Sequence, residues 1–162
     1  MNTRAVKQIS ARITPCEDVL SYQHFGLIER LQEKEKLSLE DAQQLFQDML
    51  RFLTLCDQRD EQGKGLPFLA PPEAIDVAWH HFILFTEDYA VFCTQYFGRF
   101  IHHRPATSRD VMPGNLAVKT HALARKLYGD LSKNWSCSLT AKCSPSTNCQ
   151  QPPPFDCALI RQ

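Results

Sequence analysis

The chain has 162 residues, which is enough for one domain with a sizeable core and leaves room for a tail. Its 18 Lys and Arg residues balance its 18 Asp and Glu residues, so the charge gives no indication of binding to nucleic acid or to an anionic membrane. No apolar run approaches the roughly 20 residues that span a bilayer, and residues 1–10 lack the apolar stretch of a secretory signal. We therefore expect a cytoplasmic protein without nucleic-acid or membrane partners, and a protein partner is left open.

The first third of the chain predicts two helices. Residues 14–17, Thr-Pro-Cys-Glu, match a helix start, and apolar residues continue to about Lys34, with Gly26 as a candidate break. Ser38 is placed to cap the second helix. The apolar residues of that helix follow the i, i+3, i+4, i+7 spacing: Ala42, Leu45, Phe46, Met49, Leu50, Leu53 and Cys56.

The stretch from Ile75 to Phe85 carries apolar side chains on every side of a helix. Such a pattern is typical of a buried helix, so we expect the other elements to pack around this one. A further helix should begin at a Thr86 cap and end at Gly98, which makes the pair a helical hairpin. Residues 100–105 should leave the hairpin in an extended conformation, because Pro105 disfavours helix at the residue before it.

The end of the chain predicts one more helix and a tail. The helix should start at residues 113–115 and place four leucines on one side: Leu116, Leu123, Leu127 and Leu131. Beyond Lys133 the composition changes to Ser, Thr, Gln, Pro and Cys, with few apolar groups to offset ordering entropy. We therefore predict an all-α domain in residues 1–132, a compact bundle of four or five helices around the helix of Trp79, and a flexible, disordered tail in residues 133–162.

Asp76 and His80 are the main candidates for a functional site. Their i, i+4 spacing places both on one face of the buried helix. The exit segment brings His102 and His103, of which only one should face inward because neighbours in an extended segment point to opposite sides. One carboxylate and two imidazoles suit zinc with an open position, or iron(II). A hydrogen bond from His80 to Asp76 would satisfy the same pair without a metal.

The seven cysteines fall into two groups. Cys16, Cys56 and Cys93 lie in helical patterns and are predicted to be small buried apolar residues. The other four lie in the tail without the C-x-x-C spacing of a structural zinc site: Cys137, Cys143, Cys149 and Cys157. They could form a flexible carrier for a soft metal, belong to a segment that another enzyme modifies, or have no special role.

Several fixed spacings between residue 76 and residue 105 resemble those of the glycine-rich domain-containing protein-like family, in its short stand-alone bacterial form. The residues that carry the resemblance, together with Phe97-Gly98 and Pro105, are Asp76, Trp79, His80, Tyr89, Cys93 and one of His102 and His103. The resemblance implies a fold and a shared constellation, and not a reaction. The chain departs from the plant members of that family because it has no glycine-rich extension.

These observations lead to three hypotheses. The leading one is a small metal-binding protein with zinc or iron held by Asp76, His80 and one of His102 and His103, and with Trp79, Tyr89 and Cys93 around the ligands. Metal-assisted hydrolysis or oxidation would then require an open coordination position. The second is a non-catalytic interaction module whose Asp–His pair only fixes packing. The third places the function in the tail cysteines.

Overall fold

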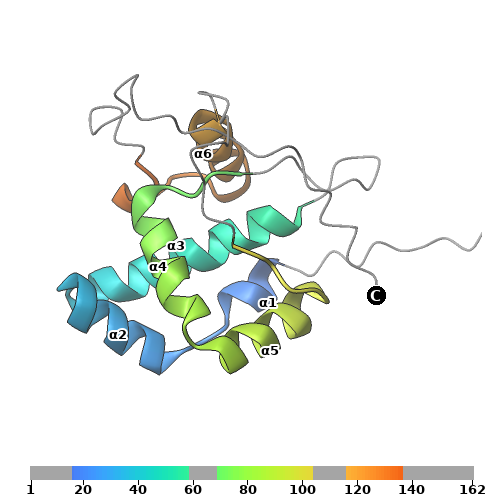
Figure 1. Ribbon diagram of the computed structural model, residues 1–162. Helices are drawn as coiled ribbons and strands as arrows, with labels where there is room; N and C mark the ends of the chain where they lie inside the picture. Colours follow the sequence, from blue (N-terminus) through green and yellow to red (C-terminus); the bar gives the residue numbers. More distant parts are fainter. Residues whose placement is uncertain (1–15, 59–68, 104–115, 137–162) are drawn as a thin grey trace, which may run out of the picture.

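The computed structural model describes residues 16–58, 69–103 and 116–136. The all-α prediction is confirmed: these residues form helices and contain no strand. Helix α4 crosses α3, with α2 and α5 on one side of the crossing and α6 on the other (Figure 1). The elements are α1 (Cys16–Leu20), α2 (Phe25–Glu35), α3 (Leu39–Asp57), α4 (Glu73–Ile83), α5 (Thr86–Phe97), α6 (Leu116–Tyr128) and the 3₁₀ helix η1 (Lys133–Trp135).

Helix α3 carries more of the core than any other described helix. Its start is capped as predicted, because the Ser38 Oγ accepts the backbone N–H of Asp41 at 3.1 Å. Ten of its residues are buried, and α3 packs against α1, α2, α4, α6 and η1. Each fully buried Leu or Phe stabilises the fold by about 1.5–3 kcal/mol relative to exposure, so the long apolar face of α3 accounts for its central place.

The first predicted helix is two helices, so the described residues form six α-helices where four or five were expected. Gly26 lies inside α2, and the break is made by residues 21–24. His24 begins α2, because its Nδ1 accepts the backbone N–H of Leu27 at 2.9 Å. Its Nε2 lies 3.1 Å from a carboxylate oxygen of Asp88 in α5. The predicted start at Thr14 lies outside the described residues.

Helices α4 and α5 form the predicted hairpin with two differences in detail. Helix α4 contacts α2, α3, α5 and η1, but His80 and Leu84 are exposed, so the apolar surface of this region does not continue around every side. Helix α5 begins with Thr86 as its first residue and without a side-chain cap. Gly98 ends α5 with a φ of 67°, in the left-handed conformation that glycine adopts without strain.

The packed region extends beyond the predicted boundary at residue 132. Helix α6 buries Leu116, Thr120 and Ala124, whereas Leu127 is exposed. The chain then turns into η1, which contacts α3 and α4 and buries Trp135 completely. Residues 133–136, assigned above to the tail, thus belong to the packed region. The four tail cysteines and the predicted helix start at residues 113–115 lie outside the described residues.

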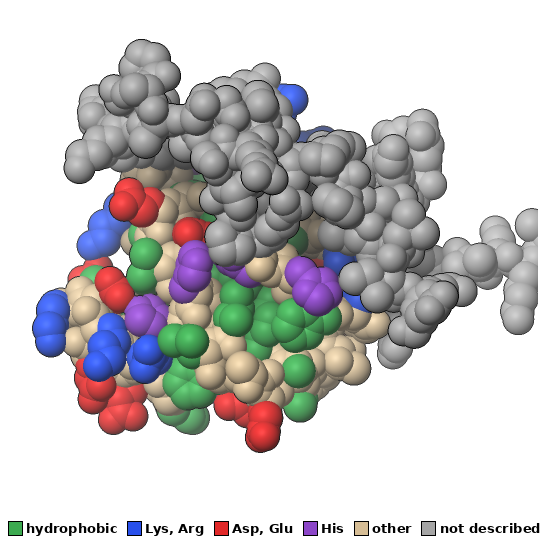
Figure 2. Space-filling view, viewed as in Figure 1, with side chains coloured by type: hydrophobic (Ala, Val, Ile, Leu, Met, Phe, Trp, Pro, Cys, Tyr) green, Lys and Arg blue, Asp and Glu red, His purple; other side chains and the backbone are tan. Residues whose placement is uncertain are grey.

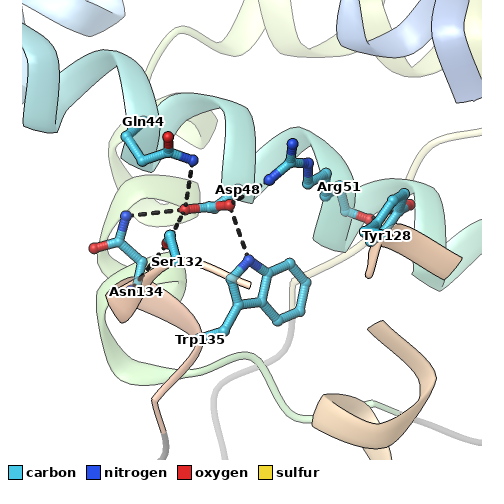
Figure 3. Close-up of polar contacts among 7 residues, drawn as sticks. All are labelled: Gln44, Asp48, Arg51, Tyr128, Ser132, Asn134 and Trp135. Carbon is cyan, nitrogen blue, oxygen red and sulfur yellow. Dashed lines mark hydrogen bonds and ion pairs between the residues drawn. The ribbon is translucent and has the colours of Figure 1, made fainter. Parts of the chain in front are cut away.

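A buried carboxylate fastens η1 to α3. Asp48 is fully buried, and side chains on α3 and around η1 surround it (Figure 3). One carboxylate oxygen accepts from Arg51 at 3.1 Å and from the Trp135 indole at 2.9 Å. The other accepts at 3.3, 2.6 and 3.0 Å from Gln44, Ser132 and Asn134. A buried charge requires such partners, so these donors stabilise Asp48 and hold the end of the packed region in place.

In the parts of the chain described here, no helix has both the length and the apolar character needed to cross a membrane.

Candidate metal centre

Three of the predicted ligands come together on one side of α4. Asp76 and His80 lie one turn apart on α4, and His103 arrives from the segment that follows α5. One ligand atom from each of the three side chains lies within 4.8 Å of the other two. On the face shown in Figure 2, histidine side chains gather in a band beside an apolar patch. Among the described residues, no other group of three His, Cys, Asp or Glu side chains brings its ligand atoms this close.

His103 is the member of the adjacent pair that faces inward. Its Nε2 lies 2.9 Å from the Oδ1 of Asp76, and only 12% of its side chain is exposed. The centre of its ring lies 4.5 Å from that of Trp79 and 4.3 Å from that of His80. His102 is exposed, with its ring 4.8 Å from that of Phe100. The predicted alternation therefore places His103, and not His102, at the site.

His80 is held mainly by the backbone of its own helix. Its Nδ1 lies 2.7 Å from the backbone oxygen of Asp76 and 3.4 Å from the Oδ2 of that residue. A backbone oxygen can only accept, so the Nδ1 of His80 is the donor in this contact. The close side-chain partner of Asp76 is thus His103 rather than His80. The His80 side chain is 53% exposed, which leaves the outer side of the cluster open to water.

Trp79, Tyr89 and Cys93 lie beneath the exit segment. The Trp79 indole donates to the Tyr89 hydroxyl at 2.9 Å, and that hydroxyl donates to the backbone oxygen of Ile101 at 2.6 Å. Burial is the main cause that raises the pKa of Tyr89 far above its ordinary value. Burial also raises the pKa of the Cys93 thiol, although its contacts with the Ile101 backbone and the Tyr89 side chain lower that pKa in part. Cys93 is therefore the buried thiol that the sequence predicted.

The remaining described histidines have other roles or places. The Nδ1 of His81 accepts from Arg30 at 3.0 Å, and its Nε2 lies 2.7 Å from a carboxylate oxygen of Glu35. These contacts tie α4 to α2, a role that the sequence analysis missed because it requires the partners on α2 to be known. His24 caps α2, and His121 lies half-buried on α6.

The converging side chains have a donor set that a transition metal prefers. They supply one carboxylate oxygen and two imidazole nitrogens, which suit zinc or iron(II). With three protein ligands, an ion would keep at least one position on the exposed side for water or another small molecule. The same geometry also supports a metal-free contact, in which His103 donates a hydrogen bond to Asp76.

No curated protein and no solved structure matches the chain. A family model does match residues 18–128, a span that contains all three converging side chains and ends before η1. It corrects the resemblance to the glycine-rich domain-containing protein-like family, which is wrong because spacings confined to one hairpin and its exit do not distinguish families. The model matches well over half of the sequence and is described as UCP032817-like, and the chain accordingly belongs to the UCP032817-like family.

Proposed function

We propose that the chain binds a divalent transition metal, zinc or iron(II), through Asp76, His80 and His103. The observation that carries the proposal is the convergence of their ligand atoms within 4.8 Å. Ligand atoms about 2.0–2.2 Å from a tetrahedral zinc ion lie roughly 3.3–3.6 Å from one another. The three ligand atoms would therefore have to approach one another by at most roughly 1.5 Å to reach coordination distance.

The exposed side of the cluster supports a site with an open position. His80 is half-exposed and Asp76 is about one-third exposed, whereas His103 is nearly covered. An ion held from the protein side by His103 would thus meet water on its outer side. When bound, zinc lowers the pKa of a coordinated water, and iron(II) with an open position can bind oxygen. Our proposal covers metal binding and leaves the reaction open.

A structural Asp–His contact is the competing proposal, and one observation favours it. The 2.9 Å contact between His103 and Asp76 satisfies both groups without an ion. In that case the contact closes the exit segment onto α4, and the domain is a non-catalytic interaction module. Asp76→Asn should then lower the melting temperature, and added metal should change nothing in either protein.

Metal titration of the stripped protein distinguishes the two proposals. We expect saturable one-to-one binding of Zn²⁺ by calorimetry, and quenching of Trp79 fluorescence by Co²⁺ because the indole packs against His103. Loss of a residue outside the ligands costs 10–100-fold in metal affinity, so Asp76→Asn, His80→Ala and His103→Ala should each exceed about 100-fold. The matched control is His102→Ala, an exposed neighbour outside the cluster.

Two results would contradict the metal proposal. One is the absence of stoichiometric binding by the wild-type chain, and the other is an equal loss of affinity in His80→Ala and His102→Ala. A chain that ends at Ser136 separates this site from the tail, because it keeps Trp135 and the cluster but lacks the four tail cysteines. Loss of Zn²⁺ binding in that shortened chain would indicate that the tail cysteines bind the metal.

A further inference from the structure

The candidate centre is assembled from two elements of different kinds. Asp76 and His80 are fixed relative to each other by the hydrogen bonds of α4. His103 lies three residues beyond Phe100 in a segment that has no regular secondary structure. Its position therefore depends on contacts that this segment makes with the helices beneath it.

We propose that Tyr89 is a positioning residue whose hydroxyl holds the backbone at Ile101 so that the His103 imidazole meets Asp76. The inference rests on the proposed function, since the arrangement that Tyr89 sets is the proposed metal centre. Tyr89 itself is no ligand, because its hydroxyl is buried and already donates to Ile101.

The Tyr89 hydroxyl connects three parts of the structure through two hydrogen bonds. Its one proton goes to the Ile101 oxygen at 2.6 Å, and it accepts the Trp79 indole proton at 2.9 Å. Tyr89, Trp79 and Ile101 are all buried, so water cannot replace either bond. The two bonds join α4, α5 and the exit segment at one oxygen atom, and displacement of the segment would leave buried polar groups unpaired.

Two connections link the Tyr89 hydroxyl to His103. Along the chain, residues 101 and 103 point to the same side of the exit segment, because side chains alternate in extended backbone. Through space, the indole that donates to Tyr89 also packs against the His103 ring, with 4.5 Å between the ring centres. Functional groups must be held within about 0.5 Å of their working geometry. If the backbone at Ile101 is held less tightly, the His103 imidazole should therefore be displaced.

Tyr89→Phe removes the hydroxyl and keeps the ring. The aromatic contacts with Phe82 and Phe100, both with ring centres 5.1 Å apart, are retained. The matched control is Thr120→Val, which removes another buried hydroxyl that bonds within α6 at 3.1 Å. Tyr89→Phe loses two buried hydrogen bonds and Thr120→Val loses one, but only Tyr89→Phe loses a bond to the segment that carries His103.

The experiment combines a Zn²⁺ titration with nuclear magnetic resonance of the metal-free histidine rings. We expect Tyr89→Phe to weaken Zn²⁺ binding 10–100-fold, the usual effect of a residue that orients a ligand, and Thr120→Val to leave it unchanged. We also expect the imidazole Nε2 signal of His103, identified by its loss in His103→Ala, to shift in Tyr89→Phe and not in Thr120→Val.

The outcomes separate this inference from the proposed function. If the wild-type chain binds Zn²⁺ and Tyr89→Phe binds it equally well with an unchanged His103 signal, the positioning role is overturned while the metal centre stands. If the wild-type chain binds no Zn²⁺, the proposed function falls and the ring signal alone decides. A shift confined to Tyr89→Phe then supports the positioning role, and an unchanged signal overturns it.

Discussion

Trp135→Phe tests how strongly the buried Asp48 carboxylate depends on the end of the packed region. The substitution keeps an aromatic ring in a fully buried position and removes the indole N–H that Asp48 accepts at 2.9 Å. Arg51 then remains as the one donor in Figure 3 to the same carboxylate oxygen. The change therefore probes a single charged hydrogen bond with little change in hydrophobic character.

The expected loss follows from two contributions. A hydrogen bond to a charged group stabilises a fold by about 1.5–3 kcal/mol, and the smaller ring leaves a void that costs about 1 kcal/mol. The free energy of unfolding should thus fall by about 2.5–4 kcal/mol. For a chain of this size, the melting temperature should fall by roughly 5–16 °C.

Trp79→Phe is the matched control, because it makes the same change at another buried indole. The Trp79 indole donates to a neutral hydroxyl, that of Tyr89, at 2.9 Å. A neutral bond contributes only about 0.5–1.5 kcal/mol, so this variant should lose roughly 1 kcal/mol less than Trp135→Phe. Urea unfolding followed by far-ultraviolet circular dichroism measures both. Equal losses would refute the idea that the Asp48 charge makes the difference.

Three further outcomes are expected. A chain that ends at Ser132 should lose cooperative unfolding in a melting scan, whereas a chain that ends at Ser136 should keep it, because only the second contains Trp135. Cys93 should resist an alkylating reagent until urea unfolds the chain, because burial raises the pKa of its thiol and blocks access; mass spectrometry detects the adduct. Burial also raises the pKa of Tyr89 in the fold, so both groups ionise first in the unfolded chain. The urea concentration at the unfolding midpoint should therefore decrease as the pH is raised from about 7 to about 10. An increase would contradict the burial of Tyr89 and Cys93 as the cause of their raised pKa values.

The helices with strong local signals were predictable, and the exceptions lie at their ends. Helix α3 combines a Ser38 cap with regular apolar spacing, and both features appear in the structure. The break between α1 and α2 was misplaced, because His24 supplies the cap and histidine is not among the residues preferred there. His24 can act in this way because Asp88 contacts its other ring nitrogen. That partner comes from α5 and has no local signal.

The candidate centre was predictable in its composition but not in its final member. The i, i+4 spacing was enough to place Asp76 and His80 together, since it depends only on helix geometry. The choice between His102 and His103 depends on which side of the exit segment faces α4. In the structure, the Tyr89 hydroxyl bonds the Ile101 backbone twelve residues away, and His103 lies on the side that faces α4. Alternation within residues 100–105 predicts that one of the two histidines faces inward, but not which one.

Asp48 and Trp135 show why composition misplaced the end of the packed region. Asp48 lies on the apolar face of α3, three residues after Leu45 and four before Phe52, both of which are buried. A carboxylate at such a position requires donors from elsewhere in the fold. The segment around Trp135 supplies them because it is polar, and polarity is the property that suggested a tail. One aromatic side chain that buries roughly 150–250 Å², joined by donors for one buried charge, can hold a short polar segment in place. The acidic residue inside the apolar face of α3 was therefore the sequence signal that a donor-rich segment belonged to the domain.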